Sequence, residues 1–588
     1  MFSQGVTIMK KVPYGIANFE AIKENSNYYY VDKTRYIEQI ENLGSKYHFF
    51  LRPRRFGKSL FLSMLEHYYD MNRKNQFDEL FGDTYIGKNP TPLRNSFPVL
   101  KLNFSGIPTH GTEAQTEHSF KVKFIGDIEL FFSKYTKHFN IGENIKNIVL
   151  AEKTTSDILN RFIAKMYECG VKYLMLIDEY DNFANNVLIH HGKDNYLALT
   201  HKGGFLRSFF AAIKNATETR TVERMFVTGV SPLVLSDVTS GMNIGDNISK
   251  NSIFNSMIGF DQKEVETMLD YYIDEKAVKS DERDEILEIF KVNYNNYCFS
   301  EKTSEKIYNS DMILYFFNNY FQDKKIPNDF LDENVRIDYG KLQFLILESK
   351  KLNGNFDLLS KLIEKKEVTT ELIHSFALKD IIDENKFKSF LYYLGLLTIK
   401  EHIFGNNFVL NIPNEVIKTM HFDYIRQSLR DGYELKINID FLKQEFMQLA
   451  FKGEWKALFD YIIKKFYEAV SIRDFVFREQ GIKMFILAYL NVTPLYFILS
   501  EPEMNRGFAD IFLQKNYFTT DKTKFEFIIE TKYVTKEELS SNSSVDYYIA
   551  EAKDQLMKYS QSQKITCPLK KIIIIASANE LLYMGDYE

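Results

Sequence analysis

Residues 47–60 read YHFFLRPRRFGKSL, and this stretch decides the fold class of the N-terminal part of the chain. Tyr47–Leu51 is a short apolar run of the kind that forms a buried strand in a parallel sheet. A loop with one glycine follows, and Lys58-Ser59 then opens an apolar segment with helical spacing. This order of strand, loop and helix predicts a phosphate site, because free N–H groups at a helix start attract anions.

Each residue of the loop has an expected role. Lys58 would reach the β- and γ-phosphates of ATP, and the Ser59 hydroxyl would ligate Mg²⁺. Arg52 stands where such loops usually carry their first glycine, so an alternative interpretation of residues 52–55 is a solvated or nucleic-acid-binding basic patch. The candidate ATP-binding residues here are Arg54, Arg55, Phe56, Gly57, Lys58, Ser59 and Leu60.

A second run, Tyr173–Glu179, is apolar up to Ile177, ends in two acids and predicts the other half of an ATPase site. Asp178 is placed to bind Mg²⁺ through water, and Glu179 to orient or activate the attacking water. The alternative is structural, since many buried strands end in acidic residues.

Two further runs, Pro98–Phe104 and Met225–Val230, look like strands of the same sheet. Alternation of strands with helical stretches predicts a three-layer α/β domain. Thr228 lies near a strand end, where it would sense the γ-phosphate or simply make a strand-end hydrogen bond.

Together these motifs resemble the prokaryotic AAA-ATPase-like family over residues 10–261. The resemblance is carried by PYGI at 13–16, YVDKT at 30–34, the loop at 52–60, IDEYD at 177–181 and TGVSP at 228–232. In that family the loop usually carries an arginine, so Arg52 fits its pattern. The resemblance implies ATP binding and kinship with ATPases that switch between states rather than with processive motors.

Residues 262–430 are expected to form a helical and winged-helix-like region. Phe390–Ile399 reads as a helix running into a strand, and residues 405–407 (GNN) as the turn of a β-hairpin. Such a unit binds DNA in some proteins and serves as a docking element or lid in others. Asn296 stands where the family pattern favours glycine, a change that a left-handed backbone position tolerates.

The C-terminal part carries a second set of charged residues on predicted strands. Phe508–Leu513 and Phe525–Tyr533 would pair as a hairpin, which brings Asp510 alongside Glu530. Period-two geometry places Glu530 and Lys532 on one face of their strand. Two carboxylates to hold Mg²⁺ or Mn²⁺ and a nearby cation are what phosphodiester hydrolysis requires.

This arrangement resembles the PD-(D/E)xK nuclease superfamily over about residues 470–580, within a region 431–588 that begins with helices. The resemblance implies that Asp510 and Glu530 are metal ligands and Lys532 is the catalytic lysine. It also implies that Glu479, the acid of the first helix, belongs to the metal site, and that Gln555 and Tyr559, four residues apart on a helix, support the site. The alternative is a decayed nuclease retained as a binding fold.

The composition fits a multidomain α/β protein. A chain of 588 residues is too long for one core, and 45% hydrophobic with 26% charged residues is ordinary for globular proteins. The net charge of -5 means that nucleic-acid contact must come from local basic patches. Three widely spaced cysteines exclude a disulfide scaffold and fit a reducing cytoplasm. We expect a prokaryotic, cytoplasmic protein without a signal peptide or membrane span, and a homo-oligomer is an open alternative.

These features predict an ATP-regulated, Mg²⁺-dependent DNA nuclease, of the kind that serves in defence or in the control of mobile DNA. The alternative is a nucleotide-dependent switch or scaffold that binds nucleic acid without cleaving it. RNA also stays open as the substrate, since no motif reads a base or a 2′-hydroxyl.

Overall fold

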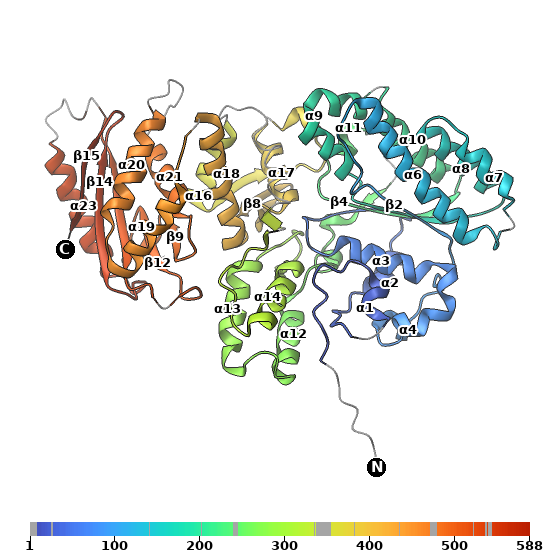
Figure 1. Ribbon diagram of the computed structural model, residues 1–588, viewed down its shortest axis with the longest axis horizontal. Helices are drawn as coiled ribbons and strands as arrows, with labels where there is room; N and C mark the ends of the chain where they lie inside the picture. Colours follow the sequence, from blue (N-terminus) through green and yellow to red (C-terminus); the bar gives the residue numbers. More distant parts are fainter. Residues whose placement is uncertain are drawn as a thin grey trace, which may run out of the picture. The chain divides into compact units, whose positions relative to one another are not determined.

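The structure is a computed structural model (Figure 1). Its contacts divide the chain into two units, the first comprising Met1–Pro327, Asp332–Leu345 and Thr369–Asn414, and the second Asn328–Leu331, Ile346–Val368 and Glu415–Glu588. The residues described are 9–24, 27–139, 141–201, 203–238, 245–333, 335–336, 354–381, 383–433, 435–470, 479–520, 522–535, 538 and 544–587.

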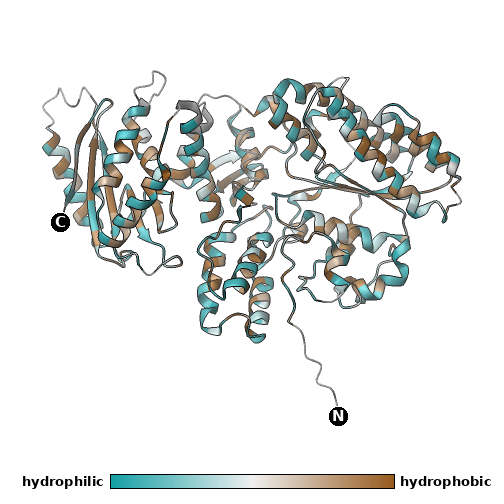
Figure 2. Cartoon of the chain, in the orientation of Figure 1, coloured by the Kyte–Doolittle hydropathy of each residue, from teal (hydrophilic) through white to brown (hydrophobic). Residues whose placement is uncertain are grey.

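A five-stranded parallel sheet forms the centre of the first unit. All six residues of β3 are buried, as expected for a parallel strand covered on both faces, and the helices around the sheet show both brown and teal residues in Figure 2. In spatial order the strands are β2 (Val99–Asn103), β3 (Tyr173–Asp178), β4 (Val222–Gly229), β1 (Tyr47–Leu51) and β5 (Asp246–Asn247).

Helices cover both faces of this sheet, which gives the three layers that the sequence predicts (Figure 1). On one face lie α1 (Phe19–Lys23), α2 (Arg35–Glu41), α3 (Lys58–Tyr69), α4 (Phe77–Phe81) and α5 (Tyr85–Lys88). On the other lie α6 (Glu113–Tyr135), α7 (Glu143–Leu150), α8 (Thr155–Glu168), α9 (Asn182–Thr200), α10 (Phe205–Glu218) and α11 (Leu233–Asp237).

The rest of the first unit is helical and then forms a small sheet. The helices are α12 (Gln262–Asp274), α13 (Arg283–Tyr294) and α14 (Ser310–Asp323), and Asn296 after α13 has a φ of +74°, in the left-handed region where it was expected. α17 (Glu384–Leu394) precedes a hairpin of β7 (Thr398–Phe404) and β8 (Asn407–Asn411). The hairpin turns at Gly405 and Asn406, within the predicted turn, and β6 (Glu367–Glu371), which the sequence reading missed, adds a third strand beside β8. DNA contact by this element stays a prediction.

The second unit is built on a mixed five-stranded sheet. β13 and β14 are parallel and joined through α23 (Val545–Tyr559), whereas the other neighbours are antiparallel. In spatial order the strands are β15 (Leu581–Tyr587), β14 (Leu569–Ala576), β13 (Glu526–Tyr533), β12 (Ile511–Lys515) and β9 (Tyr496–Ser500). The remaining helices are α16 (Gly354–Lys365), α18 (Glu415–Tyr433), α19 (Ile439–Lys452), α20 (Lys456–Val470) and α21 (Glu479–Leu490).

A hydrophobic core joins α23 to the sheet of the second unit. Phe512, Ile528 and Ile573 from three strands pack with Ala552 and Leu556 from α23, and all are essentially inaccessible. The chain is therefore an α/β multidomain protein, as predicted. Among the described residues, no helix is both long and apolar enough to cross a lipid bilayer.

Candidate functional site

The loop between β1 and α3 has the backbone of a phosphate-binding turn. Gly57, the residue before α3, has a φ of +98°, which a side chain strongly disfavours. Arg55 is also in the left-handed region, with a φ of +67°, so the loop holds local strain of the kind found at binding sites. The first N–H groups of α3 have no partner within the helix and are available to an anion.

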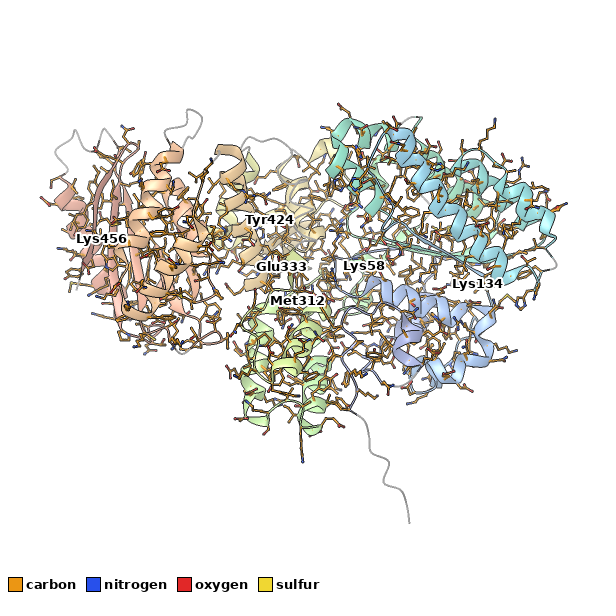
Figure 3. All side chains as sticks on the ribbon, viewed as in Figure 1. Lys58, Lys134, Met312, Glu333, Tyr424 and Lys456 are labelled. Carbon is orange, nitrogen blue, oxygen red and sulfur yellow. The ribbon has the colours of Figure 1, made fainter. Side chains whose placement is uncertain are left out.

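Lys58, labelled in Figure 3, is the first residue of α3, and its side chain bonds to its own loop. Its ammonium group donates to the carbonyl oxygens of Arg52 (2.9 Å) and Pro53 (2.8 Å). Burial lowers its pKa to about 8, although the negative charge of Glu179 opposes this shift. A phosphate would offer this buried cation a stronger partner than two neutral carbonyls.

Asp178 and Thr228 meet at the carboxyl ends of β3 and β4. The Thr228 hydroxyl donates to an Asp178 carboxylate oxygen at 2.6 Å, and both side chains are buried. Because β4 lies between β3 and β1, this pair stands behind the loop that carries Lys58. Thr228 therefore makes a strand-end hydrogen bond that orients Asp178, and γ-phosphate sensing by Thr228 stays a prediction.

Glu179 follows Asp178 and lies at the wall of a cavity. Its φ of +50° turns the chain away from β3, and the Asn182 amide donates to its carboxylate at 2.8 Å. Burial raises the pKa of Glu179, with Lys58 acting in the opposite direction. A carboxylate with a raised pKa beside a cavity suits proton transfer from water.

The cavity has a volume of about 580 Å³, which is within the range of small-molecule sites. Parts of the family motifs at 13–16 and 30–34, to which the sequence assigned no role in the site, also line it, and so do parts of 257–260 and Asp311 at the start of α14, which the sequence analysis did not name. Asp311 lies 3.8 Å from the Arg55 guanidinium. The predicted residues that line the cavity are Arg54, Arg55, Phe56, Gly57, Lys58, Ser59, Leu60 and Glu179.

Arg52 has a structural role. Its guanidinium lies between the rings of Phe50 and Phe299, 4.3 Å from each centroid, and only 1% of the residue is exposed. It donates to the carbonyl oxygens of Ser249 (2.6 Å) and Phe254 (3.0 Å). Because it is buried and bonded to the backbone, Arg52 does not belong to a solvated or nucleic-acid-binding patch.

In the second unit, Asp510 and Glu530 come together where β12 and β13 pair. The antiparallel register pairs Ile511 with Ile529, so the next position along the two chains places Asp510 opposite Glu530. Asp510 Oδ2 accepts hydrogen bonds from the backbone N–H (2.8 Å) and hydroxyl (2.9 Å) of Thr531. The hairpin predicted from the sequence thus places the two carboxylates side by side.

Glu530 has the features of a cation ligand. Its Oε2 atom is buried and accepts no hydrogen bond from any residue that the structure describes. Burial and the adjacent Asp510 raise the pKa of Glu530 to about 8, while Lys532 opposes the shift with its Nζ atom 3.6 Å from Glu530 Oε1. A buried carboxylate oxygen without a partner, next to a second carboxylate, fits a divalent cation.

Lys483 of α21 is a residue of this site that the sequence reading missed. Its buried ammonium group lies 2.9 Å from Glu501 Oε1 and 3.4 Å from Asp510 Oδ1. Burial disfavours its charge, but Asp510 and Glu501 outweigh burial, so the pKa of Lys483 is raised. The sequence signal that could have identified Lys483 is its position four residues, about one helical turn, after Glu479 in α21. Glu479 is the first residue of α21, and its side chain lies outside the described part of the structure.

Two regions of the chain match models of known protein families. Residues 13–239 match the family described as predicted AAA-ATPase, AAA-ATPase-like, and residues 477–582 match the PD-(D/E)XK nuclease superfamily. The chain joins an AAA-ATPase-like region to a PD-(D/E)XK nuclease superfamily region. Regions of these two kinds generally use a nucleotide and a divalent metal.

Individual relatives are distant. An uncharacterized protein in the vnfD 5′ region of Azotobacter chroococcum mcd 1 is 28% identical over 309 residues, 52% of this chain and 52% of that protein. The chain thus spans about half the length of this curated relative. Among solved structures, the Walker-type ATPase of Pyrococcus abyssi is similar with a TM-score of 0.39 and 13% identity, covering 70% of this chain and 98% of that one.

Tyr559 of α23 lies near the carboxylates of the nuclease superfamily region, and Gln555 lies next to Tyr559. Burial raises the pKa of Tyr559, and the charges of Glu530 and Asp510 raise it further, while a hydrogen bond with Gln555 opposes the shift. The Lys532 ammonium also lies 3.4 Å from Glu551 of this helix. The structure therefore brings Asp510, Glu530, Lys532 and Tyr559 near one another, with Gln555 bonded to Tyr559. Within the described residues, no cluster of three or more His, Cys, Asp or Glu side chains is arranged to hold a metal.

Proposed function

We propose that the AAA-ATPase-like region binds and hydrolyses ATP, and that the nuclease region cleaves DNA phosphodiester bonds with Mg²⁺ under nucleotide control. The observation that carries the nuclease part is the pairing of Asp510 with Glu530, whose Oε2 atom has no partner among the described residues, beside Lys532. A role in defence or in the control of mobile DNA is proposed on the combination of the two regions.

ATP would bind with its phosphates at the start of α3. Lys58 would exchange the carbonyls of residues 52 and 53 for the β- and γ-phosphates, and Ser59, which lines the cavity, would hold Mg²⁺ with Asp178 behind it. Thr228 fixes the carboxylate of Asp178 by its hydrogen bond. Glu179, the acid at the cavity wall, would accept a proton from the attacking water.

DNA would be cut at the carboxylate pair. A bound Mg²⁺ or Mn²⁺ supplies a water of lowered pKa and offsets the charge that develops on the phosphate. Asp510 and Glu530 would hold that ion, and the two hydrogen bonds from Thr531 keep Asp510 oriented. Lys532 would stabilise the negative charge of the transition state.

The test is cleavage of linear and circular DNA in Mg²⁺ or Mn²⁺, with and without ATP. We expect the wild type to cut, Glu530→Gln and Lys532→Ala to lose cutting by at least about a hundredfold, and Lys58→Ala to lose only the response to ATP. Lys443→Ala, at an exposed position of α19, is the matched control and should cut normally. Cutting that survives Glu530→Gln would contradict the assignment.

A second candidate is a nucleotide-dependent switch that binds nucleic acid without cleaving it. It is favoured by Lys483, whose ammonium lies 3.4 Å from Asp510 Oδ1 as a cation already in place. DNA binding in a gel shift without cleavage in either metal would support it. Cleavage of RNA but not of DNA under the same conditions would support phosphodiester hydrolysis at this centre with RNA as the substrate.

A further inference from the structure

A short hairpin next to Asp510 exposes a large aromatic ring. β10 (Glu503–Met504) and β11 (Gly507–Phe508) are inserted between β9 and β12. Met504 at the base of this hairpin is completely buried, whereas 64% of Phe508, two residues before Asp510, is exposed. The core therefore gives no reason for a phenylalanine at this position.

The hairpin is held firmly, so the exposure of this ring does not come from a loose loop. The Lys558 ammonium donates to the Arg506 carbonyl (3.0 Å), and the Lys564 ammonium donates to the Glu503 carbonyl (2.8 Å). Asn505 donates to the Lys558 carbonyl at 2.8 Å. Gly507 packs so closely on α23 that an added Cβ would lie 2.6 Å from the Tyr559 ring.

The turn of this hairpin keeps an arginine at a strained position. Asn505 and Arg506 form a two-residue connection with φ values of +45° and +63°. Such turns favour glycine at the second position, because other residues are strained there. The strained Arg506 is exposed, and the Lys558 ammonium at its carbonyl adds a second positive charge at this turn, whereas the cross-strand partner of Phe508 is Glu503. Strain retained at an exposed turn is typical of functional sites.

We propose that this hairpin grips a single-stranded stretch of the nucleic acid at the nuclease centre. Phe508 stacks on a base next to the scissile phosphate, and Arg506 and Lys558 contact the flanking phosphates. An exposed ring fixed beside cations is the combination with which proteins bind single strands, because every base offers a face for stacking and the backbone is anionic. This inference rests on the proposed function, since it requires a nucleic-acid substrate.

The experiment measures binding and cleavage separately with the full-length chain. Binding of fluorescein-labelled single-stranded and duplex DNA is followed in EDTA, where cleavage is absent. We expect Phe508→Ala to weaken single-strand binding roughly tenfold and Phe508→Trp to restore it. In the tryptophan variant, single-stranded DNA should also quench the new fluorescence, which is readable because Trp455, the one natural tryptophan, is buried.

Arg506→Gly tests the electrostatic part. It relieves the strained backbone, so its unfolding midpoint should rise, yet its DNA affinity should fall and depend less steeply on salt, by about one unit of slope. Tyr517→Ala is the matched control, because Tyr517 is 47% exposed beyond the other end of β12 and should bind normally when replaced.

The outcomes separate this inference from the proposed function. Wild-type cleavage with unchanged binding and cleavage in Phe508→Ala would overturn the inference and leave the nuclease standing. A larger loss on duplex than on single strands would also overturn it. If the wild type neither binds nor cleaves nucleic acid, both the inference about the hairpin and the proposed nuclease function would be wrong.

Discussion

Lys483 and Asp510 have different contacts at the candidate nuclease centre. One oxygen of Asp510 accepts two hydrogen bonds from Thr531, and the other faces the Lys483 ammonium at 3.4 Å. Glu530 keeps one buried oxygen without a partner in the described residues. In the metal-free protein, the positive charge of Lys483 thus partly neutralises Asp510, at the position where a metal ion would otherwise do so.

Replacing Lys483 with methionine should have opposite effects on stability and on metal binding. Loss of the largely buried ion pair should destabilise the metal-free protein by about 1–3 kcal/mol. Removal of the competing charge should tighten Mg²⁺ binding. Urea unfolding with and without Mg²⁺ measures both, with the exposed Lys443→Met as control. Unchanged Mg²⁺ affinity would show that Lys483 does not compete with the ion.

The pKa of Lys58 predicts how ATP binding depends on pH. Only the ammonium form attracts phosphate, and burial lowers the pKa of Lys58 in the free protein to about 8. A bound phosphate raises this pKa again, so ATP binding takes up a proton once the pH exceeds 8. Affinity should therefore be nearly constant below pH 8 and fall above it, by up to about tenfold per pH unit. Calorimetric titration checks this, and Lys58→Ala should bind weakly with no such fall.

At the scale of the element, β1 carries a buried histidine that limits acid stability. His48 is 1% exposed, and burial lowers its pKa to about 4, although Asp246 acts in the opposite direction. In the unfolded chain its pKa is ordinary, so between these values the unfolded state binds more protons than the folded state. The contribution of neutral His48 to the free energy of unfolding is thus fully present above about pH 6.5, and it is lost as the pH falls to 4.

Replacing His48 with leucine should remove this pH dependence. The slope of unfolding free energy against pH between 4 and 6.5 should decrease by up to about 1.4 kcal/mol per pH unit. Urea unfolding across this range, followed by circular dichroism, gives the slope. The exposed His138→Leu is the control and should leave it unchanged. An equal slope in His48→Leu and wild type would show that His48 does not titrate with unfolding.

At the scale of the whole molecule, nucleotide control requires a free energy that couples the two sites. If ATP changes the affinity for DNA, then DNA must change the affinity for ATP by the same factor, typically about 5–150-fold. Both titrations can be made on Glu530→Gln, in which DNA should stay intact. We expect equal factors, and both should disappear in the Lys58→Ala, Glu530→Gln double variant. If ATP leaves the affinity for DNA unchanged and DNA leaves the affinity for ATP unchanged, the two regions act independently.

The parts of the sites that lie close together in sequence could be predicted from it. The strand, loop and helix around Gly57 form one continuous segment, and Asp510 and Glu530 belong to one hairpin with period-two strands. The motif at 13–16 was recognised, but its place in the cavity wall was not, and 257–260 gave no signal, because a linear sequence does not show which distant segments meet. Lys483 was missed for the same reason, since its partners are 18 and 27 residues away on other elements.

The sequence by itself determined the two phosphate-chemistry motifs, the alternation that makes each region α/β, and the residue types available for chemistry. These follow from local periodicity and spacing, which are properties of neighbouring residues. Only the tertiary structure decided that Arg52 is a buried anchor, that Thr228 bonds to Asp178, and that Phe508 stands exposed beside Asp510. Burial and partners depend on packing between elements far apart in the chain, because folding brings distant side chains into contact.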